Sequence, residues 1–305
     1  MANPRIIAVT GASGFVGSAL VPSLTTAGHR IVRVTRGRPA APPGERVVRW
    51  DPAEGDLPPE SLQGVDAVVN LSGESVATGR WTPAKKQRIR DSRVRSTGRL
   101  CETLARLPRP PRVLVSASAV GYYGDRGAEP LREESAPGKT FLAEVCRDWE
   151  AATRPASEGG IRVVMLRMGL VLSPTGGALA TMLTPFSLGA GGPIGTGTQY
   201  VSWITLPDLV AVIEHALDSD ALQGPVNAVA PGAVTNAELA RTLGRVLGRP
   251  AFLPLPAMLA RVMFGEMADD LLLASARVEP GRLQAAGHVF QHPTLEGALR
   301  QLLAR

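Results

Sequence analysis

The stretch AVTGASGFVGSAL, residues 8–20, contains three glycines at three-residue spacing, Gly11, Gly14 and Gly17. It follows the apolar run RIIAVT, residues 5–10, and leads into a helical pattern. A glycine-rich turn between a strand and a helix presents backbone N–H groups and the positive helix end to a pyrophosphate. Gly11 would permit the tight turn, Gly14 would let the phosphates approach, and Gly17 would let the helix pack on the strand. The context predicts a dinucleotide-binding turn, and the alternative is a purely structural turn.

Beyond this turn, short β-branched runs alternate with longer helical patterns as far as residue 172. The apolar runs cover residues 30–35, 46–50, 66–71, 112–118 and 161–172, and helices are expected near 83–106 and 140–158. Strands that are apolar throughout, alternating with helices, are typical of a parallel sheet covered on both faces. We therefore expect an α/β fold with a doubly wound parallel Rossmann sheet.

The amino-acid composition changes after residue 172. Gly- and Thr-rich loops follow, and the last part of the 305-residue chain has mainly helical patterns. We expect residues 1–172 to form an NADP-binding Rossmann domain and residues 173–305 to form a smaller, mainly helical substrate lobe. A further strand pattern at 225–230 predicts that segments near 201–230 return to the first domain, so the lobes are partly interwoven.

Composition limits the possible partners. The net charge is +6, and the densest basic cluster, KKQRIRDSRVRSTGR at residues 85–99, has no aromatic residues to stack on bases. We interpret it as a solvated helix and expect no nucleic-acid partner. The sequence has no run typical of a membrane span or signal peptide, and its two cysteines and four histidines have no metal-ligand spacing. These features predict a cytoplasmic protein without membrane or metal binding.

The end of the second strand predicts which dinucleotide binds. A carboxylate there would bond the ribose 2′-hydroxyl and repel a 2′-phosphate. The chain instead has Thr35, Arg36 and Arg38, and no acidic residue occurs between Gly17 and Glu45. Because a guanidinium suits a phosphate, the expected cofactor is NADP(H).

Several longer motifs together resemble one family. They are TGASGFVG (10–17), VVNLSGE (68–74), SASAVGYYG (116–124), LRMGLVLSPTGGAL (166–179), GAGGPIGTGTQYVSWI (189–204) and GHVFQHPTLEGAL (287–299). With them the chain resembles the extended, atypical short-chain dehydrogenases/reductases, an epimerase-like NAD(P)-binding family described as nucleoside-diphosphate-sugar epimerases. The resemblance covers essentially the whole chain.

The resemblance implies a set of cofactor contacts. It places Gly11, Gly14, Phe15 and Gly17 around the pyrophosphate, and Thr35 and Arg36 at the adenosine phosphate. It places Leu71 and Ser72 beside the adenine ribose, and Arg93 reaches the cofactor from the following helix. The backbone around Met168 and Val171 would flank the nicotinamide. One position departs from the family pattern, because the common WIH is Trp203, Ile204 and Thr205 here. The family's imidazole is therefore absent at residue 205.

The proton-transfer residues of ordinary reductases are also missing. Those enzymes use a Tyr whose pKa is lowered by a Lys four residues later. No tyrosine of this chain has Lys at that spacing. At the expected place Phe141 or Leu142 takes the Tyr position, and Val145 or Cys146 takes the Lys position. Neither pair can move a proton as the Tyr–Lys dyad does.

Two candidate catalytic residues remain, Ser118 and Tyr123. Ser118 keeps its family place at the end of the fifth strand, and Tyr123 lies just beyond it. Tyr123 would either donate the proton or merely line the pocket. The sequence thus predicts an NADP(H)-binding oxidoreductase or epimerase-like enzyme acting on a small polar substrate, with sugar nucleotides as one class. The alternative is a non-catalytic NADPH-binding regulator or scaffold.

Overall fold

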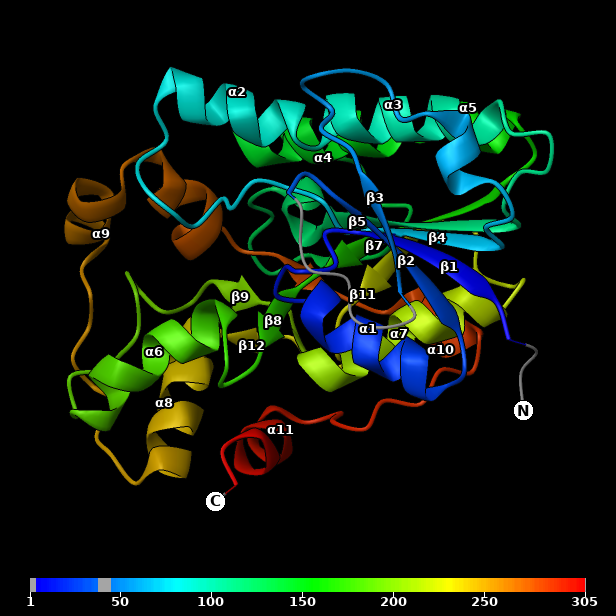
Figure 1. The fold of residues 1–305 in the computed structure, drawn as a ribbon. Coiled ribbons are helices and arrows are strands. Elements are labelled where there is room, and N and C mark those ends of the chain that lie inside the picture. Colours follow the sequence, from blue (N-terminus) through cyan, green and yellow to red (C-terminus); the bar gives the residue numbers. More distant parts are fainter. Residues whose placement is uncertain (1–3, 38–44, 305) are drawn as a thin grey trace.

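A computed structural model describes residues 4–37 and 45–304 of the chain. Its centre is a seven-stranded sheet in the order β11-β7-β5-β4-β1-β2-β3, in which every neighbouring pair is parallel (Figure 1). The strands are β1 (Ile6–Thr10), β2 (Arg30–Thr35), β3 (Arg46–Arg49), β4 (Ala67–Asn70), β5 (Val113–Ala119), β7 (Arg162–Met168) and β11 (Gly224–Ala228). The predicted doubly wound parallel sheet is confirmed.

Helices cover both faces of this sheet (Figure 1). One face carries α1 (Gly17–Thr26), α7 (Leu206–Asp218) and α10 (Gly281–Ala285), and the other carries α2 (Pro83–Asp91), α3 (Val94–Ala105), α4 (Phe141–Ala151) and α5 (Arg154–Glu158). Successive strand residues point to opposite faces. Ile7 therefore packs in the core beneath α1, whereas its neighbour Ala8 packs in the core beneath α3. Burial on both faces explains why these strands are apolar throughout.

A smaller lobe lies beside the carboxyl ends of the strands (Figure 1). Its helices are α6 (Gly177–Ser187), α8 (Asn236–Leu247), α9 (Ala257–Phe264) and α11 (Leu295–Leu302), with a π-helix at Ala268–Leu273. Three short strand pairs join the parts: β8 (Leu170–Leu172) with β10 (Trp203–Thr205), β9 (Tyr200–Val201) with β12 (Val234–Thr235), and β6 (Pro130–Leu131) with β13 (Arg277–Val278). The domain division at residue 172 stays a prediction.

Two elements differ from the sequence prediction. The helix expected over 83–106 is divided into α2 and α3, and at the break the Ser92 hydroxyl accepts a hydrogen bond from the Glu74 N–H at 2.9 Å. The strand expected over 161–172 is divided at Gly169, where a Cβ would lie 2.6 Å from the Ser202 carbonyl oxygen. This close approach lets β8 leave the main sheet and pair with β10.

The basic segment 85–99 covers α2 and the beginning of α3. Most of its cations have acidic partners in the same chain, as in the pairs Lys85–Glu74 at 2.8 Å, Lys86–Glu266 at 2.7 Å and Arg90–Asp148 at 2.5 Å. The segment is therefore internally paired, but it spans two helices and its Lys85 is buried instead of solvated. In the described part of the chain, no helix is long and apolar enough to cross a membrane.

Candidate cofactor and catalytic site

The glycine turn requires two of its three glycines for the fold itself. Gly11 has φ +66°, and a Cβ on it would lie 2.8 Å from the Leu71 carbonyl carbon. A Cβ on Gly17 would lie 2.3 Å from the Gly11 carbonyl oxygen, so the helix could not pack as it does. Gly14 differs, because its Cβ would meet only the Gly11 oxygen at 3.1 Å. Gly14 therefore borders open space, as a phosphate-binding position would.

That open space is a cavity of about 530 Å³ between the glycine turn and a second glycine loop at residues 175–177. Its lining is Ser13, Gly14, Phe15, Ser18, Ala19, Thr175, Gly176, Gly177 and Leu206. The Phe15 ring lies against the second loop, since a Cβ on Gly176 would come within 2.8 Å of it. The volume falls in the usual range of ligand pockets. Sequence reasoning missed the 175–177 loop as a site, although its SPTGG motif was the available signal.

The beginning of α1 has no capping group. No side chain caps its N-terminus at Val16, and its first turn contains no acidic residue. A threonine side chain accepts a backbone N–H at this position in α2, α4, α7 and α8, whereas α6, whose first residue Gly177 borders the same cavity, has no side-chain cap either. The positive end of α1 and its free N–H groups are thus available to an anion at the turn. A pyrophosphate fits this arrangement.

The structure places Thr35 and Arg36 at the carboxyl end of β2, on the strand next to β1. Arg36 is exposed. The first acidic residue after Gly17, Glu45, precedes β3 and forms an ion pair with Arg33 in the middle of β2. The Glu45 carboxylate is therefore engaged by Arg33, and no ion pair of Arg36 is found among the described residues. Arg38 lies outside the described residues.

Leu71 and Ser72 follow β4 and lie directly against the turn. The Leu71 N–H donates to the Thr10 carbonyl oxygen at 3.3 Å. The closeness of Gly11 to the Leu71 carbonyl and the Ser72 nitrogen brings these three residues together at one edge of the sheet. Contact of Leu71 and Ser72 with an adenine ribose stays a prediction of the resemblance.

Arg93 contributes a half-buried cation to the same edge. Its guanidinium donates to the Glu74 carbonyl oxygen at 3.0 Å, lies beside Gly73 and stacks over the Trp149 ring at 5.2 Å. Among the described residues, no carboxylate forms an ion pair with it. Burial lowers the pKa of Arg93. A buried guanidinium bonded only to neutral groups is suited to an anionic ligand.

Met168 and Val171 flank the break at Gly169, close to the second glycine loop. A Cβ on Gly177 would lie 3.4 Å from the Val171 carbonyl oxygen. Both residues are half-buried; Met168 is the last residue of β7, and Val171 lies in the middle of β8. Neither residue belongs to the lining of the 530 Å³ cavity, and their contact with a nicotinamide stays a prediction.

An imidazole is present near residue 205 after all. Thr205 occupies the position of the family's histidine, but His292 from the C-terminal segment places its Nδ1 3.2 Å from the Thr205 hydroxyl. The same Nδ1 lies 2.9 Å from the Asp208 carboxylate, which is fully buried. The family's imidazole at residue 205 is absent, as the sequence shows, and a different ring, that of His292, reaches the same place from a distant part of the chain.

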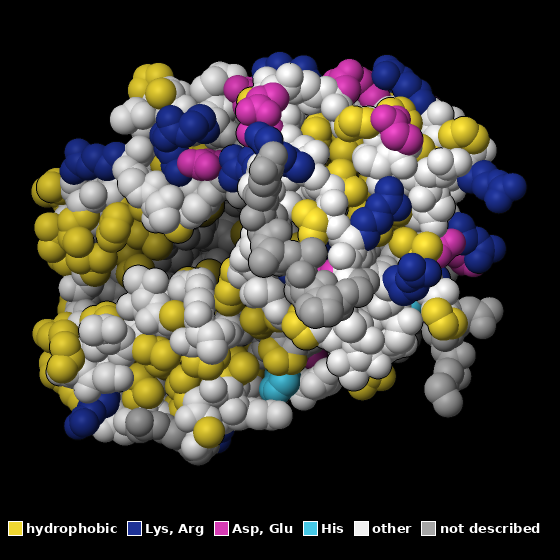
Figure 2. All heavy atoms as spheres, viewed as in Figure 1, with side chains coloured by type: hydrophobic (Ala, Val, Ile, Leu, Met, Phe, Trp, Pro, Cys, Tyr) yellow, Lys and Arg dark blue, Asp and Glu magenta, His cyan; other side chains and the backbone are white. Residues whose placement is uncertain are grey.

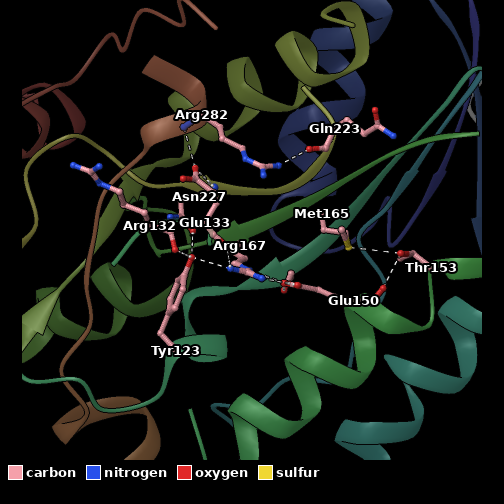
Figure 3. Close-up of polar contacts among 11 residues, drawn as sticks. Tyr123, Arg132, Glu133, Glu150, Thr153, Met165, Arg167, Gln223, Asn227 and Arg282 are labelled. Atoms are coloured by element: carbon pink, nitrogen blue, oxygen red, sulfur yellow. Dashed lines mark hydrogen bonds and ion pairs between the residues drawn. The ribbon is translucent and has the colours of Figure 1, made fainter. Parts of the chain in front are cut away.

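A row of polar side chains crosses the carboxyl ends of three strands. Ser118 of β5, Arg167 of β7 and Asn227 of β11 are in register, so all three point to the same face of the sheet. The Ser118 hydroxyl donates to the Glu150 carboxylate at 2.7 Å. Arg167 holds that carboxylate with two bonds of 2.8 Å each, as Figure 3 shows. Ser118 is therefore fixed by a buried ion pair.

Tyr123 lies inside this network and does not face the cavity. Its side chain is fully buried, and its hydroxyl lies 2.6 Å from Asn227 Oδ1 and 2.9 Å from the Arg167 guanidinium (Figure 3). Burial raises the pKa of Tyr123 to about 12. Neither expected role, proton donor or pocket wall, is supported by these contacts. The structure assigns Tyr123 to the polar core.

The place of the missing Tyr–Lys dyad on α4 is apolar. Leu142 and Val145 are buried in a cluster with Trp81 and Met267. Burial raises the pKa of the Cys146 thiol to about 12, so it is neutral near pH 7. No residue at these positions can transfer a proton, as the sequence predicts. In the described part of the chain, no group of three His, Cys, Asp or Glu residues could hold a metal ion.

Sequence reasoning missed Glu150, Arg167 and Glu133 as members of the network. The Glu133 carboxylate is buried and accepts the backbone N–H groups of Asn227 and Arg282, each at 3.1 Å. Glu133 therefore belongs to the polar core although it follows an exposed loop. Arg167, in the middle of the mainly apolar run 161–172, was an available signal, because a charge in a buried strand needs a partner.

Comparison with known proteins now decides the family. The model of the NAD dependent epimerase/dehydratase family matches residues 7–229. The chain belongs to the NAD dependent epimerase/dehydratase family. A second model, a domain of unknown function named DUF1731, matches residues 255–302.

Relatives within this family match over almost the full chain. The epimerase family protein Mb2239 of Mycobacterium bovis is 44% identical over 299 residues, which are 98% of this chain and 97% of the relative. A crystal structure of human epimerase family protein SDR39U1 with NADPH is 36% identical and has a TM-score of 0.89. The match covers 98% of this chain and 99% of that one. A nucleoside-diphosphate sugar epimerase from Corynebacterium glutamicum is 38% identical with a TM-score of 0.80, covering 99% of this chain and 58% of that one.

Proposed function

We propose that the protein binds NADP(H) at the carboxyl edge of its sheet, across the glycine turn. The observation that carries this proposal is the uncapped start of α1, which opens on a 530 Å³ cavity bordered by Gly14. The half-buried Arg93 supplies a second group suited to an anion. The human relative crystallised with NADPH supports the same ligand.

The adenosine end favours the phosphorylated cofactor. Arg36 is exposed at the end of β2, where a 2′-phosphate would lie. The nearest acidic residue along the chain, Glu45, is engaged by Arg33. Because the Arg36 guanidinium would attract the 2′-phosphate and no free carboxylate would repel it, the site should prefer NADPH over NADH.

The reaction we propose is oxidation and reduction of a hydroxyl-bearing small polar substrate. Bound NADP(H) supplies hydride chemistry. Ser118 orients the substrate: because its hydroxyl hydrogen is donated to Glu150 in a hydrogen bond, its oxygen lone pairs are left to accept a hydrogen bond from a substrate hydroxyl. Sugar nucleotides are rich in such hydroxyls, and the Corynebacterium relative is described as a nucleoside-diphosphate sugar epimerase.

A second candidate function is NADPH binding without turnover, as a regulator or scaffold. The buried apolar side chains of Leu142 and Val145, where reductases place their proton-transfer dyad, favour it. Loss of general acid–base help slows such reactions by about 10²–10⁴-fold. The two candidates therefore differ in turnover and agree in cofactor binding.

Calorimetric titration tests the shared part of the proposal. NADPH is expected to bind at least about tenfold more tightly than NADH, a difference of about 1.4 kcal/mol. Arg36→Ala should remove most of that difference and leave NADH binding almost unchanged. Arg30→Ala, at the opposite end of the same strand, is the matched control and should keep the preference. Equal affinities of the wild-type protein for both cofactors would overturn the NADP(H) assignment.

Turnover then separates enzyme from regulator. Fractions of a metabolite extract are screened for substrate-dependent loss of NADPH absorbance and, by NMR, for conversion of a component without net loss of NADPH, because an epimerase returns the hydride to its substrate. An enzyme gives a saturable rate that falls in Ser118→Ala without loss of NADPH affinity. Tight NADPH binding with no turnover in any fraction would favour the regulator.

A further inference from the structure

Tyr122 differs from its neighbour Tyr123 in having a free hydroxyl. Both belong to the 3-10 turn Val120–Tyr123, whose successive residues point about 120° apart. The turn therefore buries Tyr123 and leaves Tyr122 half-buried. In the described part of the chain the Tyr122 hydroxyl has no hydrogen-bond partner, and the buried side-chain atoms without a partner are all imidazole nitrogens. The hydroxyl is thus open to solvent.

The Tyr122 ring is held in place on the buried ion pair. Its centroid lies 3.5 Å from the Arg167 guanidinium carbon, which is a cation–π contact. The Glu150 carboxylate that fixes Arg167 also accepts the Ser118 hydroxyl. The Gly138 N–H donates to the Tyr122 carbonyl oxygen at 2.9 Å and fixes the backbone. Tyr122 and Ser118 therefore take their positions from the same ion pair.

Further contacts connect Tyr122 to the expected nicotinamide end of the cofactor. Its ring packs on the apolar cluster that includes Val229. A Cβ on Gly169 would lie 2.9 Å from the Val229 side chain, and Gly169 separates Met168 from the segment of Val171, the two residues predicted to flank the nicotinamide. Figure 2 shows a hollow between the two parts of the molecule, and the carboxyl ends of β5 and β7 point toward it in the same view of Figure 1. Because Tyr122 directly follows β5, its free hydroxyl is on the side from which a substrate would approach.

We propose that Tyr122 transfers the proton to or from the reacting oxygen of the substrate, an inference that rests on the proposed oxidoreductase function. The Ser118 hydroxyl hydrogen is engaged by Glu150 and that of Tyr123 by Asn227, so neither hydroxyl is left to protonate a carbonyl oxygen. The free Tyr122 hydroxyl acts as the general acid in their place. Ser118 accepts a hydrogen bond from a neighbouring hydroxyl of the same substrate.

The proposed step balances in both directions. In reduction, the carbonyl carbon of the substrate gains the hydride of NADPH, and the carbonyl oxygen gains the Tyr122 proton. The alcohol, NADP⁺ and a tyrosinate are formed, and the tyrosinate takes up a proton from solvent at its open side. In oxidation, the tyrosinate removes the hydroxyl proton while the hydride returns to NADP⁺.

Tyr200 is the matched control for this assignment. It is also half-buried, and its ring centroid lies 5.4 Å from the guanidinium carbon of Arg277. It belongs to β9, which pairs with β12 in the smaller lobe. No contact of Tyr200 with Ser118, Glu150 or Arg167 is found among the described residues.

Chemical modification tests where the hydroxyl lies, without any substrate. The folded full-length chain is treated with tetranitromethane, and nitrated tyrosines are located by mass spectrometry. Tyr122 and Tyr200 should be nitrated, whereas the buried Tyr123 should not. Saturating NADP⁺, whose binding is verified by calorimetry in the same buffer, should protect Tyr122 and leave the nitration of Tyr200 unchanged.

Turnover tests the proton transfer, with the extract fraction that the wild-type chain converts as substrate. Tyr122→Phe keeps the ring on Arg167 and removes only the hydroxyl, so the protein should stay folded. Its kcat should fall by about 10²–10⁴-fold, with KM and NADPH affinity nearly unchanged. Tyr200→Phe should keep the wild-type kcat.

Two results would overturn the inference and leave the proposed function intact. One is nitration of Tyr122 that is absent, or that does not change although calorimetry shows NADP⁺ binding. The other is a wild-type kcat in folded Tyr122→Phe. A wild-type chain that does not bind NADP⁺, or that converts no fraction, would instead overturn the proposed enzyme function, and the inference with it.

Discussion

Glu150 and Arg167 form a bidentate ion pair beneath the carboxyl edge of the sheet, with both nitrogen–oxygen distances at 2.8 Å. The Arg167 side chain is only 3% exposed. Its remaining amino group bonds the Tyr123 hydroxyl and the Glu133 carbonyl oxygen, each at 2.9 Å. All the polar atoms of a buried charge pair are thus satisfied, and Ser118 takes its orientation from it.

Glu150→Gln is expected to destabilise the protein by about 3–5 kcal/mol, because it leaves the buried Arg167 charge without a counterion. Urea unfolding at neutral pH measures the change. Glu129→Gln, which breaks the exposed pair of Arg126 and Glu129, is the control and should cost less than about 1 kcal/mol. Equal losses in both variants would show that the buried network is not a special source of stability.

Gly14→Val is expected to abolish NADPH binding while the protein remains folded. The new Cβ meets only the Gly11 oxygen, and its methyl groups extend into the space where the phosphates would lie. Gly17→Ala should instead lower the free energy of unfolding, since its Cβ would overlap the Gly11 carbonyl. Calorimetry and thermal melting distinguish the two effects. Normal NADPH affinity in folded Gly14→Val would mean that the loop is only a turn.

Gly98→Ala is expected to stabilise the protein by about 0.5–1 kcal/mol. Gly98 is inside α3, where glycine carries an entropic cost, and a Cβ on it would meet no atom within 4 Å. The midpoint of urea unfolding should rise with an unchanged m-value. A fall in the midpoint would reveal a packing restriction at this position.

Tyr123 is expected to make the folded state sensitive to alkaline pH. Its pKa is about 12 when folded, above the value of about 10 in an unfolded chain. The stability due to its neutral form is complete below pH about 10 and is lost as the pH rises toward about 12. Tyr123→Phe should be less stable at neutral pH by about 1–3 kcal/mol, because Asn227 and Arg167 lose a partner. The variant should also lose less stability on alkaline titration; an identical slope in both proteins would contradict the buried, protonated tyrosine.

The sequence was sufficient for the sheet and the glycine turn, because both depend on local patterns. The strands around Ile7 and Val68 are buried on both faces, which produces the continuous apolar runs. The helix and strand breaks at Ser92 and Gly169 could not be predicted, since they depend on contacts with Glu74 and Ser202 from elsewhere in the chain.

The same difference separates the cofactor site from the catalytic residues. Gly11 and Gly17 belong to the same turn, so their spacing in the sequence indicates that both are needed for its close packing. Tyr123 is five residues after Ser118, but a 3-10 turn at Val120–Tyr123 carries its side chain into the core. The direction of a side chain after such a turn is set by the partners it finds, here Asn227 and Arg167.

The place of β11 at the edge of the sheet bears on how the protein folds during its synthesis. β11 pairs with β7, yet 55 residues separate Met168 from Gly224. While a ribosome is still making that stretch, β7 has an unpaired apolar edge of the kind that joins strands of other chains. A nascent chain halted just after residue 172 should therefore be prone to aggregate and to recruit chaperones, and one extended beyond residue 228 should be protected.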